Sequence, residues 1–410
     1  MSKYAAILHY YWNRAGGAEL VCASVARAFE AAGLDPLLTS PVSIHVEKYP
    51  EWFGIDLSKY AKYSTKIELR AFSLYLRLLV GYVGKKVIRK YEPELIFTDV
   101  PFYKPLIKEV VKRRIKLIEY IHFPLEVSYL INEDPYIMDI MERYGRFPLN
   151  IYWRLFKWLS KHYVRKNPFD VASAVLTNSS WTANIIKDVY GGVPEVLNPP
   201  LSPSVEIIDR SSVTSFEHRE NSVVMVGRFS EEKRYHWVIT RLMPALRREL
   251  GGIKLFVFGS AGTRTSTNYL RKLVKLAESL GFKTSMFLGS NADIYLVPDV
   301  PKREITKTMD TSKVFLHATI NEQWGVAVAE AMARGLPIIV HKSGGTWNDL
   351  ARHEESGLGY ENVDEAVKNL ADVMTNEKVW RHYSSKSLER VRELTLNKFI
   401  AQLINILRLT

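Results

Sequence analysis

The sequence predicts an α/β protein of two domains, each built around a parallel sheet. The chain has 410 residues, which is too long for one ordinary hydrophobic core. Short apolar runs alternate with helical patterns along both halves, and this alternation is typical of βαβ units. Between about residues 193 and 221 it stops, and prolines and serines follow without periodicity. We therefore predict a domain boundary in this stretch and a cleft between the domains.

In the first half, apolar runs predict strands over residues 4–10, 94–99, 116–122 and 174–180. Helices are predicted over residues 21–33, around 102–114 and over 181–191, the last capped by Ser180. We assign residues 1–205 to the N-terminal domain.

The second half restarts the pattern. Strands are predicted over residues 222–227, 254–260, 284–289, 313–319 and 337–343, each followed by a loop and a helix. Helical segments fill the end of the chain from about residue 363 to residue 409. We assign residues 206–385 to the C-terminal domain and residues 386–410 to a C-terminal helix.

Composition narrows the class of protein. Hydrophobic residues make up 47% and charged residues 24%, values typical of a globular protein. The single cysteine, Cys22, excludes an internal disulfide and fits a reducing, cytoplasmic setting. The net charge of +12 indicates acidic partners such as nucleic acid, anionic lipid or a phosphorylated substrate. We expect neither a signal peptide nor a membrane-spanning helix, because the apolar runs are too short.

Two segments, residues 66–90 and 145–166, combine basic and apolar side chains without being long and clean enough to span a bilayer. On a helix over the second segment, one face carries Arg154, Lys157, Lys161 and Arg165, and another carries Tyr152, Phe156, Leu159 and Tyr163. This pattern predicts a helix that lies on an anionic membrane. The alternative is a core helix whose basic face is merely solvated.

The stretch NEQWGVAVAEAMARG predicts a phosphate site where a strand gives way to a helix of small residues. Gly325 and Val326 begin the helix, whose N–H groups and dipole favour a phosphate. Glu330 follows about 7–8 Å along the axis, where a carboxylate can accept hydrogen bonds from ribose hydroxyls. Glu322 lies on the opposite side, where a sugar attached to the diphosphate would be.

Two further candidates lie in the first half. Gly16 and Gly17 separate the first strand from the first helix and let the backbone approach a ligand closely. The alternative is an ordinary tight turn, because the spacing of a dinucleotide-binding glycine motif is absent. His122 ends a predicted strand just before a proline turn, which fits a catalytic residue or a satisfied core histidine equally well.

Arg228 and Lys233 leave the end of another predicted strand together. A planar guanidinium and a point charge suit a diphosphate, although Glu231 and Glu232 also fit an ordinary charged surface. The sequence contains no Asp-x-Asp pair and no clustered metal-ligand spacing. The two cations and a helix dipole are therefore expected to stabilise a leaving diphosphate without a metal ion.

Taken together, these motifs resemble the retaining glycosyltransferases of family four, which have the GT-B fold. The resemblance rests on the Glu-x7-Glu pair before AMARGLPIIVHKSGG, on GRFSEEK and on GGAE. YIHFP and LTNSSWT are in addition similar to the mannosyltransferases that extend a dolichol-linked oligosaccharide. The implied fold is two Rossmann-like domains that face a central cleft, with the C-terminal helix crossing back to the N-terminal domain. Residues 1–205 would bind the acceptor and dock on a membrane, and residues 206–385 would bind the nucleotide sugar.

The resemblance also implies the substrates and the roles. The donor would be GDP-mannose and the acceptor a dolichyl- or polyprenyl-phosphate-linked glycan, joined by an α-mannosidic bond without a metal or cofactor. His122 would face the donor sugar, Glu322 would hold the sugar hydroxyls and Glu330 the ribose. Arg228 and Lys233 would bind the diphosphate, and Gly16 and Gly17 would close over the phosphates. Unlike the eukaryotic members, the sequence shows no N-terminal transmembrane helix, so we expect peripheral association with the cytoplasmic face of a membrane.

Three alternatives remain open at this stage. A UDP-sugar could replace GDP-mannose, with a soluble or another glycolipid acceptor, because the base pocket around residues 287–293 cannot be identified from the sequence. A GT-B sugar epimerase would need no acceptor site. A nucleic-acid-binding protein would explain the charge, but the sequence contains no recognisable binding module.

Overall fold

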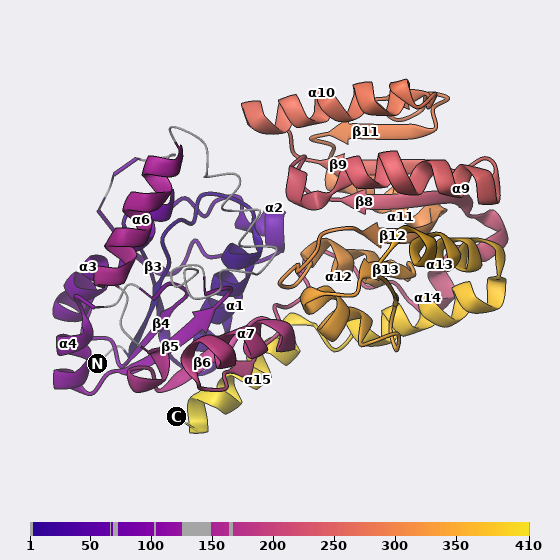
Figure 1. Ribbon diagram of the computed structural model, residues 1–410. Helices are drawn as coiled ribbons and strands as arrows, with labels where there is room; N and C mark the ends of the chain where they lie inside the picture. The colour runs from indigo at the N-terminus through magenta and orange to yellow at the C-terminus, as the bar shows by residue number, and fades with distance from the viewer. Residues whose placement is uncertain are drawn as a thin grey trace. The chain divides into compact units, whose positions relative to one another are not determined.

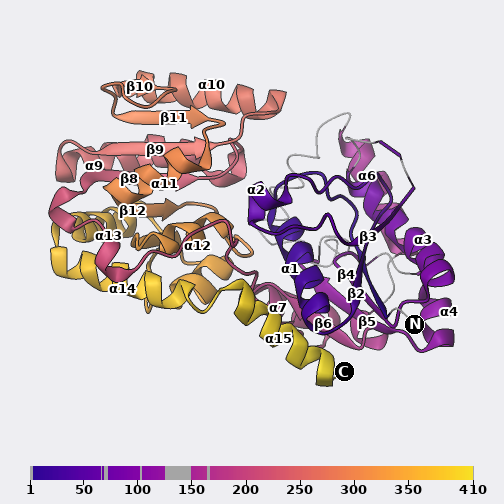
Figure 2. The ribbon, with the colours of Figure 1, turned by 180° about the vertical axis from the view of Figure 1, so that it is seen from behind.

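The computed structural model describes residues 3–65, 67–68, 73–101, 104–124, 149–163 and 167–409. The chain divides into two compact units, which Figures 1 and 2 show from opposite sides. The N-terminal unit comprises residues 1–205 and 394–410, and the C-terminal unit comprises residues 206–393. Each unit contains a seven-stranded sheet whose strands all pair in parallel, which confirms the predicted α/β class.

The sheet of the N-terminal unit has the strand order β3-β2-β1-β4-β5-β6-β7. Its strands are β1 (Tyr4–Leu8), β2 (Asp35–Ser40), β3 (Ala61–Ser64), β4 (Leu95–Thr98), β5 (Lys116–Ile121), β6 (Ala174–Thr177) and β7 (Glu195–Val196). The central strands are almost continuously apolar because helices cover both faces of a parallel sheet. Leu8 pairs with Thr98, and Thr98 pairs with Glu119, so β1 and β4 end at the same level and β5 runs two residues further.

The described helices of this unit are α1 (Gly17–Ala31), α2 (Tyr49–Phe53), α3 (Ser73–Tyr91), α4 (Ile107–Arg113), α6 (Leu149–Tyr163), α7 (Ser180–Tyr190) and α15 (Leu396–Leu409). The helix α7 is capped by Ser179 and not by the predicted Ser180, because the Ser179 hydroxyl accepts a hydrogen bond from the N–H of Thr182 at 3.1 Å. Helix α15 packs against α1, and Phe399, Leu403 and Ile406 complete the core beneath it (Figure 2).

Helix α6 corrects the predicted membrane-facing side of residues 145–166. Phe156 is 0% exposed and Trp153 is 5% exposed, because both pack with α3 in a core on one side of the sheet. The exposed apolar side chains of α6 are instead Ile151, Leu155 and Trp158. Arg154 and Lys161 are exposed on the same side. Residues 66, 69–72, 145–148 and 164–166 of the two predicted segments lie outside the described residues, as does the side chain of Tyr163.

The sheet of the C-terminal unit has the order β10-β11-β9-β8-β12-β13-β14. Its strands are β8 (Glu220–Val226), β9 (Lys254–Gly259), β10 (Thr284–Ser285), β11 (Ile294–Pro298), β12 (Ser312–His317), β13 (Ile338–His341) and β14 (Leu358–Tyr360). The strand predicted over residues 284–289 is therefore wrong beyond Ser285. The apolar run that follows, at 294–298, forms the longer strand.

The helices of the C-terminal unit are α8 (Tyr235–Trp237), α9 (Met243–Leu250), α10 (Arg264–Ser279), α11 (Lys302–Thr311), α12 (Val326–Ala333), α13 (Val363–Thr375) and α14 (Glu377–Val391). Helix α14 ends before α15 begins at Leu396, so residues 386–410 do not form one helix as predicted. No helix within the described ranges is both long enough and apolar enough to cross a membrane.

Candidate active site

Three loops meet at one edge of the C-terminal sheet, where β8, β12 and β13 lie next to one another and end. Arg228 and Lys233 follow β8, and Glu322 follows β12. Because the carboxyl ends of parallel strands lie at the same edge, residues about 90 positions apart in the sequence can come into contact there.

Lys233 and Glu322 form the central contact of this edge. The Nζ of Lys233 lies 2.6 Å from Oε2 of Glu322, and both side chains are largely buried. Burial alone would raise the pKa of Glu322. The charge of Lys233, followed by the hydrogen bonds from His317 and Lys233, outweighs burial and holds this pKa well below its ordinary value. The carboxylate is therefore ionised at neutral pH.

His317, the last residue of β12, contacts the Glu322 carboxylate. Its Nε2 lies 3.2 Å from the same carboxylate oxygen. Burial, together with the charge of Lys233, lowers the pKa of His317 despite the nearby carboxylate. The ring is therefore neutral and donates its Nε2 hydrogen to Glu322.

The loop that carries Glu322 is fixed by the loop after β13. Gly344 has φ of 76°, and a Cβ at this position would lie 2.3 Å from the carbonyl oxygen of Glu322. The N–H of Gly345 donates to that oxygen at 2.7 Å, and the N–H of Asn321 donates to the Ser343 hydroxyl at 2.8 Å. The SGG sequence therefore permits the close approach of two loops and holds Glu322 in place.

Helix α12 begins next to this loop. Gly325 precedes Val326 with φ of 91°, and a Cβ on Gly325 would lie 2.5 Å from Cγ2 of Thr346, so only glycine fits. Gly325 has no side chain to cap the helix. The Val328 N–H donates to the Gly325 carbonyl oxygen at 3.0 Å, and the N–H groups that precede it can donate to solvent or a ligand. Further along α12, the Glu330 carboxylate lies 3.0 Å from Nζ of Lys302 at the start of α11.

Arg228 is not part of the Lys233–Glu322 contact. Its side chain is 68% exposed, and its guanidinium lies 3.3 Å from the carboxylate of Glu232. The two predicted diphosphate cations therefore leave the same strand end, but only Lys233 contacts Glu322.

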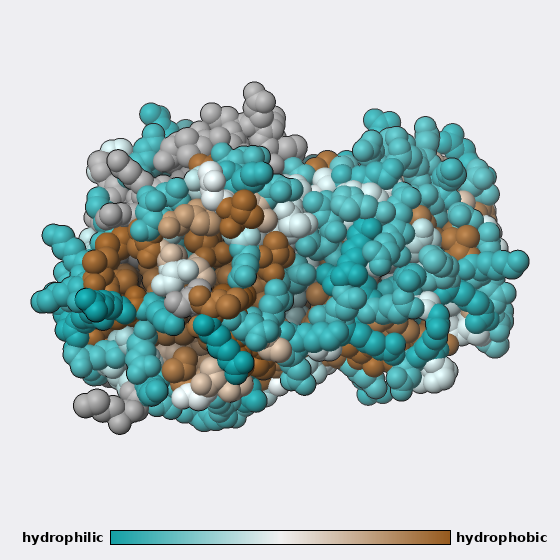
Figure 3. Space-filling view, turned by 90° about the horizontal axis from the view of Figure 1, so that it is seen from below, coloured by the Kyte–Doolittle hydropathy of each residue, from teal (hydrophilic) through white to brown (hydrophobic). Residues whose placement is uncertain are grey.

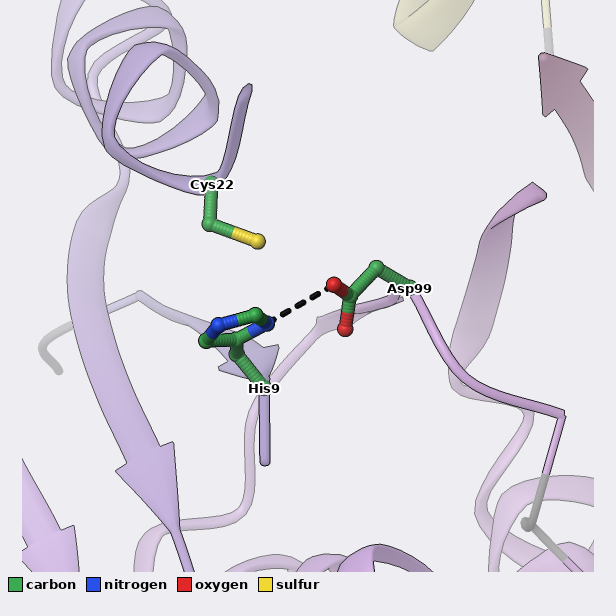
Figure 4. A group of neighbouring side chains, drawn as sticks. All are labelled: His9, Cys22 and Asp99. Carbon is green, nitrogen blue, oxygen red and sulfur yellow. Dashed lines mark hydrogen bonds and ion pairs between the residues drawn. The ribbon is translucent and has the colours of Figure 1, made fainter. Parts of the chain in front are cut away.

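The N-terminal unit carries a second group of polar side chains at the carboxyl edge of its own sheet. His9, Asp99 and His122 each directly follow one of the neighbouring strands β1, β4 and β5. The Nδ1 of His9 lies 2.7 Å from Oδ2 of Asp99 (Figure 4), and Nε2 of His122 lies 3.5 Å from the same oxygen. His9 and Asp99 are buried, whereas the side chain of His122 is 26% exposed.

His9 is held in its protonated form. Its Nε2 lies 2.7 Å from the carbonyl oxygen of Tyr11, which can only accept, and its Nδ1 faces the Asp99 carboxylate. Burial opposes the charge on His9, but Asp99 raises the pKa of His9 well above its ordinary value, and the pKa of Asp99 is correspondingly lowered. Cys22 approaches within 4.8 Å of both groups. Because both His9 nitrogens already donate, His9 offers no lone pair to a metal ion.

Gly16 and Gly17 lie at the start of α1, where the structure gives them a local role. A Cβ on Gly16 would lie 2.3 Å from Oε2 of Glu19, so glycine makes room for a carboxylate in the first helical turn. Glu19 is buried, and its Oε1 lies 2.6 Å from Nε of Arg14 and 3.7 Å from Nε2 of His9. This end of the helix therefore already faces an anion.

Four residues of these two edges were not predicted: His9, Glu19, Asp99 and His317. Three of them lie within the last three residues of a predicted strand, as His122 does, so the rule that ligands bind at carboxyl strand ends would have found them. Glu19 had no comparable signal, since an acidic residue in a first helical turn is common.

Residues 208–390 match the family model "Glycosyl transferases group 1". The GDP-Man:Man(3)GlcNAc(2)-PP-Dol alpha-1,2-mannosyltransferase of Candida glabrata is 31% identical over 263 residues, which cover 61% of this chain and 47% of the relative. The human protein of that name is 24% identical over 213 residues, which cover 50% of this chain and 42% of the relative. The chain thus spans about half the length of these curated relatives.

Solved structures match over nearly the whole chain. A sucrose-phosphate synthase from Thermosynechococcus elongatus superposes with a TM-score of 0.69 at 15% identity, covering 99% of this chain and 98% of the other. HepE of Anabaena, in a complex with UDP, superposes with a TM-score of 0.67 at 15% identity, covering 100% of both chains. Residues 208–390 are therefore similar to the glycosyl transferases of group 1, and the two α/β units have the GT-B fold.

Proposed function

We propose that this protein is a retaining glycosyltransferase that moves mannose from GDP-mannose to a lipid-linked glycan and forms an α-mannosidic bond. The observation that carries the proposal is the Lys233–Glu322 pair beside the start of α12, which offers a cation, a carboxylate and helix N–H groups at one strand edge. The names of the curated relatives support mannose, GDP and a dolichol-linked acceptor.

Each group has a role in this reaction. When the donor binds, Lys233 and Arg228 take the diphosphate, together with the N–H groups at Gly325 and Val326. Lys233 then contacts the diphosphate in place of the Glu322 carboxylate. Glu322 is thereby able to accept hydrogen bonds from the mannose hydroxyls. Glu330 accepts hydrogen bonds from the ribose.

The bond changes follow from retention of configuration. The bond between mannose C1 and the phosphate oxygen breaks, and the acceptor hydroxyl attacks C1 from the face that the phosphate leaves. The departing phosphate oxygen takes the proton of that hydroxyl, so GDP leaves without a separate protein base. His122 and the glycines Gly16 and Gly17 belong to the N-terminal unit, and we propose that they act on the donor sugar and phosphates.

A donor screen tests this function and the absence of a metal requirement together. Transfer from radiolabelled GDP-mannose, UDP-glucose and UDP-N-acetylglucosamine to a polyprenyl-diphosphate-linked glycan is measured with excess EDTA. We expect transfer from GDP-mannose only, undiminished by EDTA, because no Asp-x-Asp pair occurs in the sequence and Lys233 is placed to neutralise the leaving group. Transfer from a UDP-sugar alone would replace the donor assignment, and activity restored only by manganese would refute metal independence.

The two glutamates are expected to separate binding from turnover. Glu330→Gln should weaken GDP binding about tenfold, because the ribose loses a charged acceptor. Glu322→Ala should lower kcat and leave GDP affinity nearly unchanged, since its partner is the sugar. Calorimetric titration with GDP and single-turnover kinetics measure the two effects, with the exposed Glu249→Gln as control. Unchanged GDP affinity in Glu330→Gln would exclude the ribose role.

We further propose that the N-terminal unit docks on the cytoplasmic face of an anionic membrane. The exposed stripe consists of Leu79 and Tyr82 of α3 together with Ile151, Leu155 and Trp158 of α6. Figure 3 shows apolar surface concentrated on the N-terminal unit in that view, while the C-terminal unit there is mostly hydrophilic. Lys86, Arg154 and Lys161 are exposed beside the stripe. An anionic bilayer can bind such a surface, because its headgroups attract the basic side chains and its acyl region buries the apolar ones.

Liposome co-sedimentation tests this docking. We expect wild type to bind vesicles of equal parts phosphatidylcholine and phosphatidylglycerol and to be released only partly at high salt, because apolar burial is not screened. Leu155→Glu combined with Trp158→Glu should abolish binding. Met286→Glu with Phe287→Glu is the matched control, since these exposed apolar residues lie in the C-terminal unit. Equal binding by both double variants would contradict the proposed surface.

A further inference from the structure

Two buried polar atoms at the carboxyl ends of β4 and β5 have no hydrogen-bond partner among the described residues. They are Oδ1 of Asp99 and Nε2 of His122. The His122 nitrogen lies 3.5 Å from the other oxygen of Asp99, which is longer than a good hydrogen bond. Buried polar atoms left unpaired are costly, and hydrogen bonds at reactive sites commonly tighten when substrate binds. A small closing movement would therefore join His122 to Asp99.

Asp99 is already held on its other side by His9. The 2.7 Å contact from His9 Nδ1 and the 2.7 Å contact from His9 Nε2 to the Tyr11 carbonyl fix His9 as an imidazolium. A permanent cation at this distance keeps Asp99 ionised. Asp99 can therefore accept a second hydrogen bond but cannot donate one.

The charges around the His9–Asp99 pair balance one another. Five described side chains that can carry a charge act on the His9–Asp99 pair: Arg14, Glu19, Cys22, Tyr49 and His122. The His9 and Arg14 cations balance the Asp99 and Glu19 anions, and the buried thiol and phenol stay protonated.

We propose that Asp99 is the positioning residue of His122: its carboxylate accepts the Nε2 hydrogen and so leaves Nδ1 as the acceptor atom of the ring. The effect of this positioning on turnover rests on the proposed function, because Nδ1 of His122 then accepts a hydrogen bond from a hydroxyl of the donor mannose. His9 acts only through Asp99, as its fixed counter-ion.

Asp99→Asn reverses this arrangement with little change in shape. The amide can turn its NH2 toward His122, whose Nε2 becomes the acceptor while Nδ1 carries the hydrogen. We expect kcat for mannosyl transfer to fall about ten- to hundredfold, the range found when a group that orients another is removed. KM for GDP-mannose should change less, since His122 acts on the sugar and not on the diphosphate.

The test is histidine-selective 15N NMR of the protein without substrate, with the His122 signals identified by their loss in His122→Asn. We expect a protonated Nε2 and an unprotonated Nδ1 on His122 in wild type, and the reverse or a mixture in Asp99→Asn. Asp35→Asn makes the same chemical change at an exposed position at the start of β2 and should leave the His122 signals unchanged.

Each outcome decides the proposal separately from the proposed function. A protonated Nδ1 on His122 in wild type overturns the proposal. This measurement needs only the wild-type protein, so it decides the question even if Asp99→Asn does not fold. The same tautomer in wild type and in folded Asp99→Asn overturns it as well. If the tautomers behave as expected but wild type transfers no mannose from GDP-mannose, the positioning role stands and the donor assignment fails.

Discussion

Replacing Lys233 by methionine is expected to lower kcat/KM for mannosyl transfer about 10²- to 10³-fold, the loss typical of removing one donor that stabilises a developing anion. Methionine keeps the length and apolar stem of lysine but removes the charge 2.6 Å from Glu322. Two effects combine, because the leaving diphosphate loses its cation and the Glu322 carboxylate loses its counter-ion. The pKa of Glu322 should therefore rise, and the remaining activity should fall in mild acid where wild type keeps its rate.

Steady-state kinetics between pH 5 and pH 8 measure both effects. Lys272→Met is the matched control, because Lys272 lies in the same unit with an exposed side chain and an ion pair to Glu231 at 3.5 Å. A Lys233→Met enzyme within threefold of wild type, while Lys272→Met is also unchanged, would remove Lys233 from the leaving-group site.

His9→Gln is expected to destabilise the N-terminal unit by about 3–5 kcal/mol, the usual cost of removing one partner from a buried ion pair. Glutamine is neutral, so Asp99 and Glu19 lose the cation 2.7 Å and 3.7 Å away from their oxygens. Urea-dependent hydrogen exchange of the β1 and β4 amides reports the opening of this unit. His218→Gln, whose ring is 76% exposed, should change the same amides by less than 0.5 kcal/mol.

The destabilisation depends on pH in a defined direction. The pKa of folded His9 lies above its unfolded value, so the stabilisation from its charge is complete below about pH 6.5 and is lost as pH rises toward the folded pKa. The pKa of Asp99 is lowered, so its contribution is complete above about pH 3.9 and is lost only in strong acid. The difference between wild type and His9→Gln should therefore be larger at pH 5.5 than at pH 9. A difference that grows toward pH 9 would mean that His9 is buried neutral.

Sequence periodicity was sufficient to predict the central strands of the sheets but not the edge strands. The runs at β1, β4, β8, β9 and β12 are almost continuously apolar because both faces of these strands are covered. Edge strands need less apolar surface, and β10 shows the difficulty: Phe287 lies in an apolar run that resembles a strand, yet its side chain is 68% exposed.

The orientation of α6 could not be obtained from the sequence, because its aromatic residues occur on two faces. Trp153 and Phe156 belong to the face that meets α3, and Trp158 belongs to the opposite face. Periodicity shows that an apolar stripe exists. Only the neighbouring helix decides which stripe is covered, since both can bury comparable area.

For the candidate site, the motif spacing placed Glu322 and Lys233 correctly after their strands, and their contact follows from the order of β8 and β12. The partners of Glu330 and Arg228 were not predictable. Lys302 and Glu232 are ordinary charged residues in the sequence, and ion pairs of exposed side chains carry little specific signal. The His9–Asp99 pair was missed because the two residues lie 90 positions apart, and only the pairing of β1 with β4 brings them together.

The return of α15 to the N-terminal unit constrains the order in which the chain can fold during synthesis. The core under α1 includes Phe399, Leu403 and Ile406, which leave the ribosome after all of residues 206–393. The C-terminal unit is continuous in sequence and can close as soon as it emerges. The N-terminal unit is made first but keeps an apolar gap along α1 until translation is nearly finished, so vectorial folding runs opposite to the usual N-to-C order.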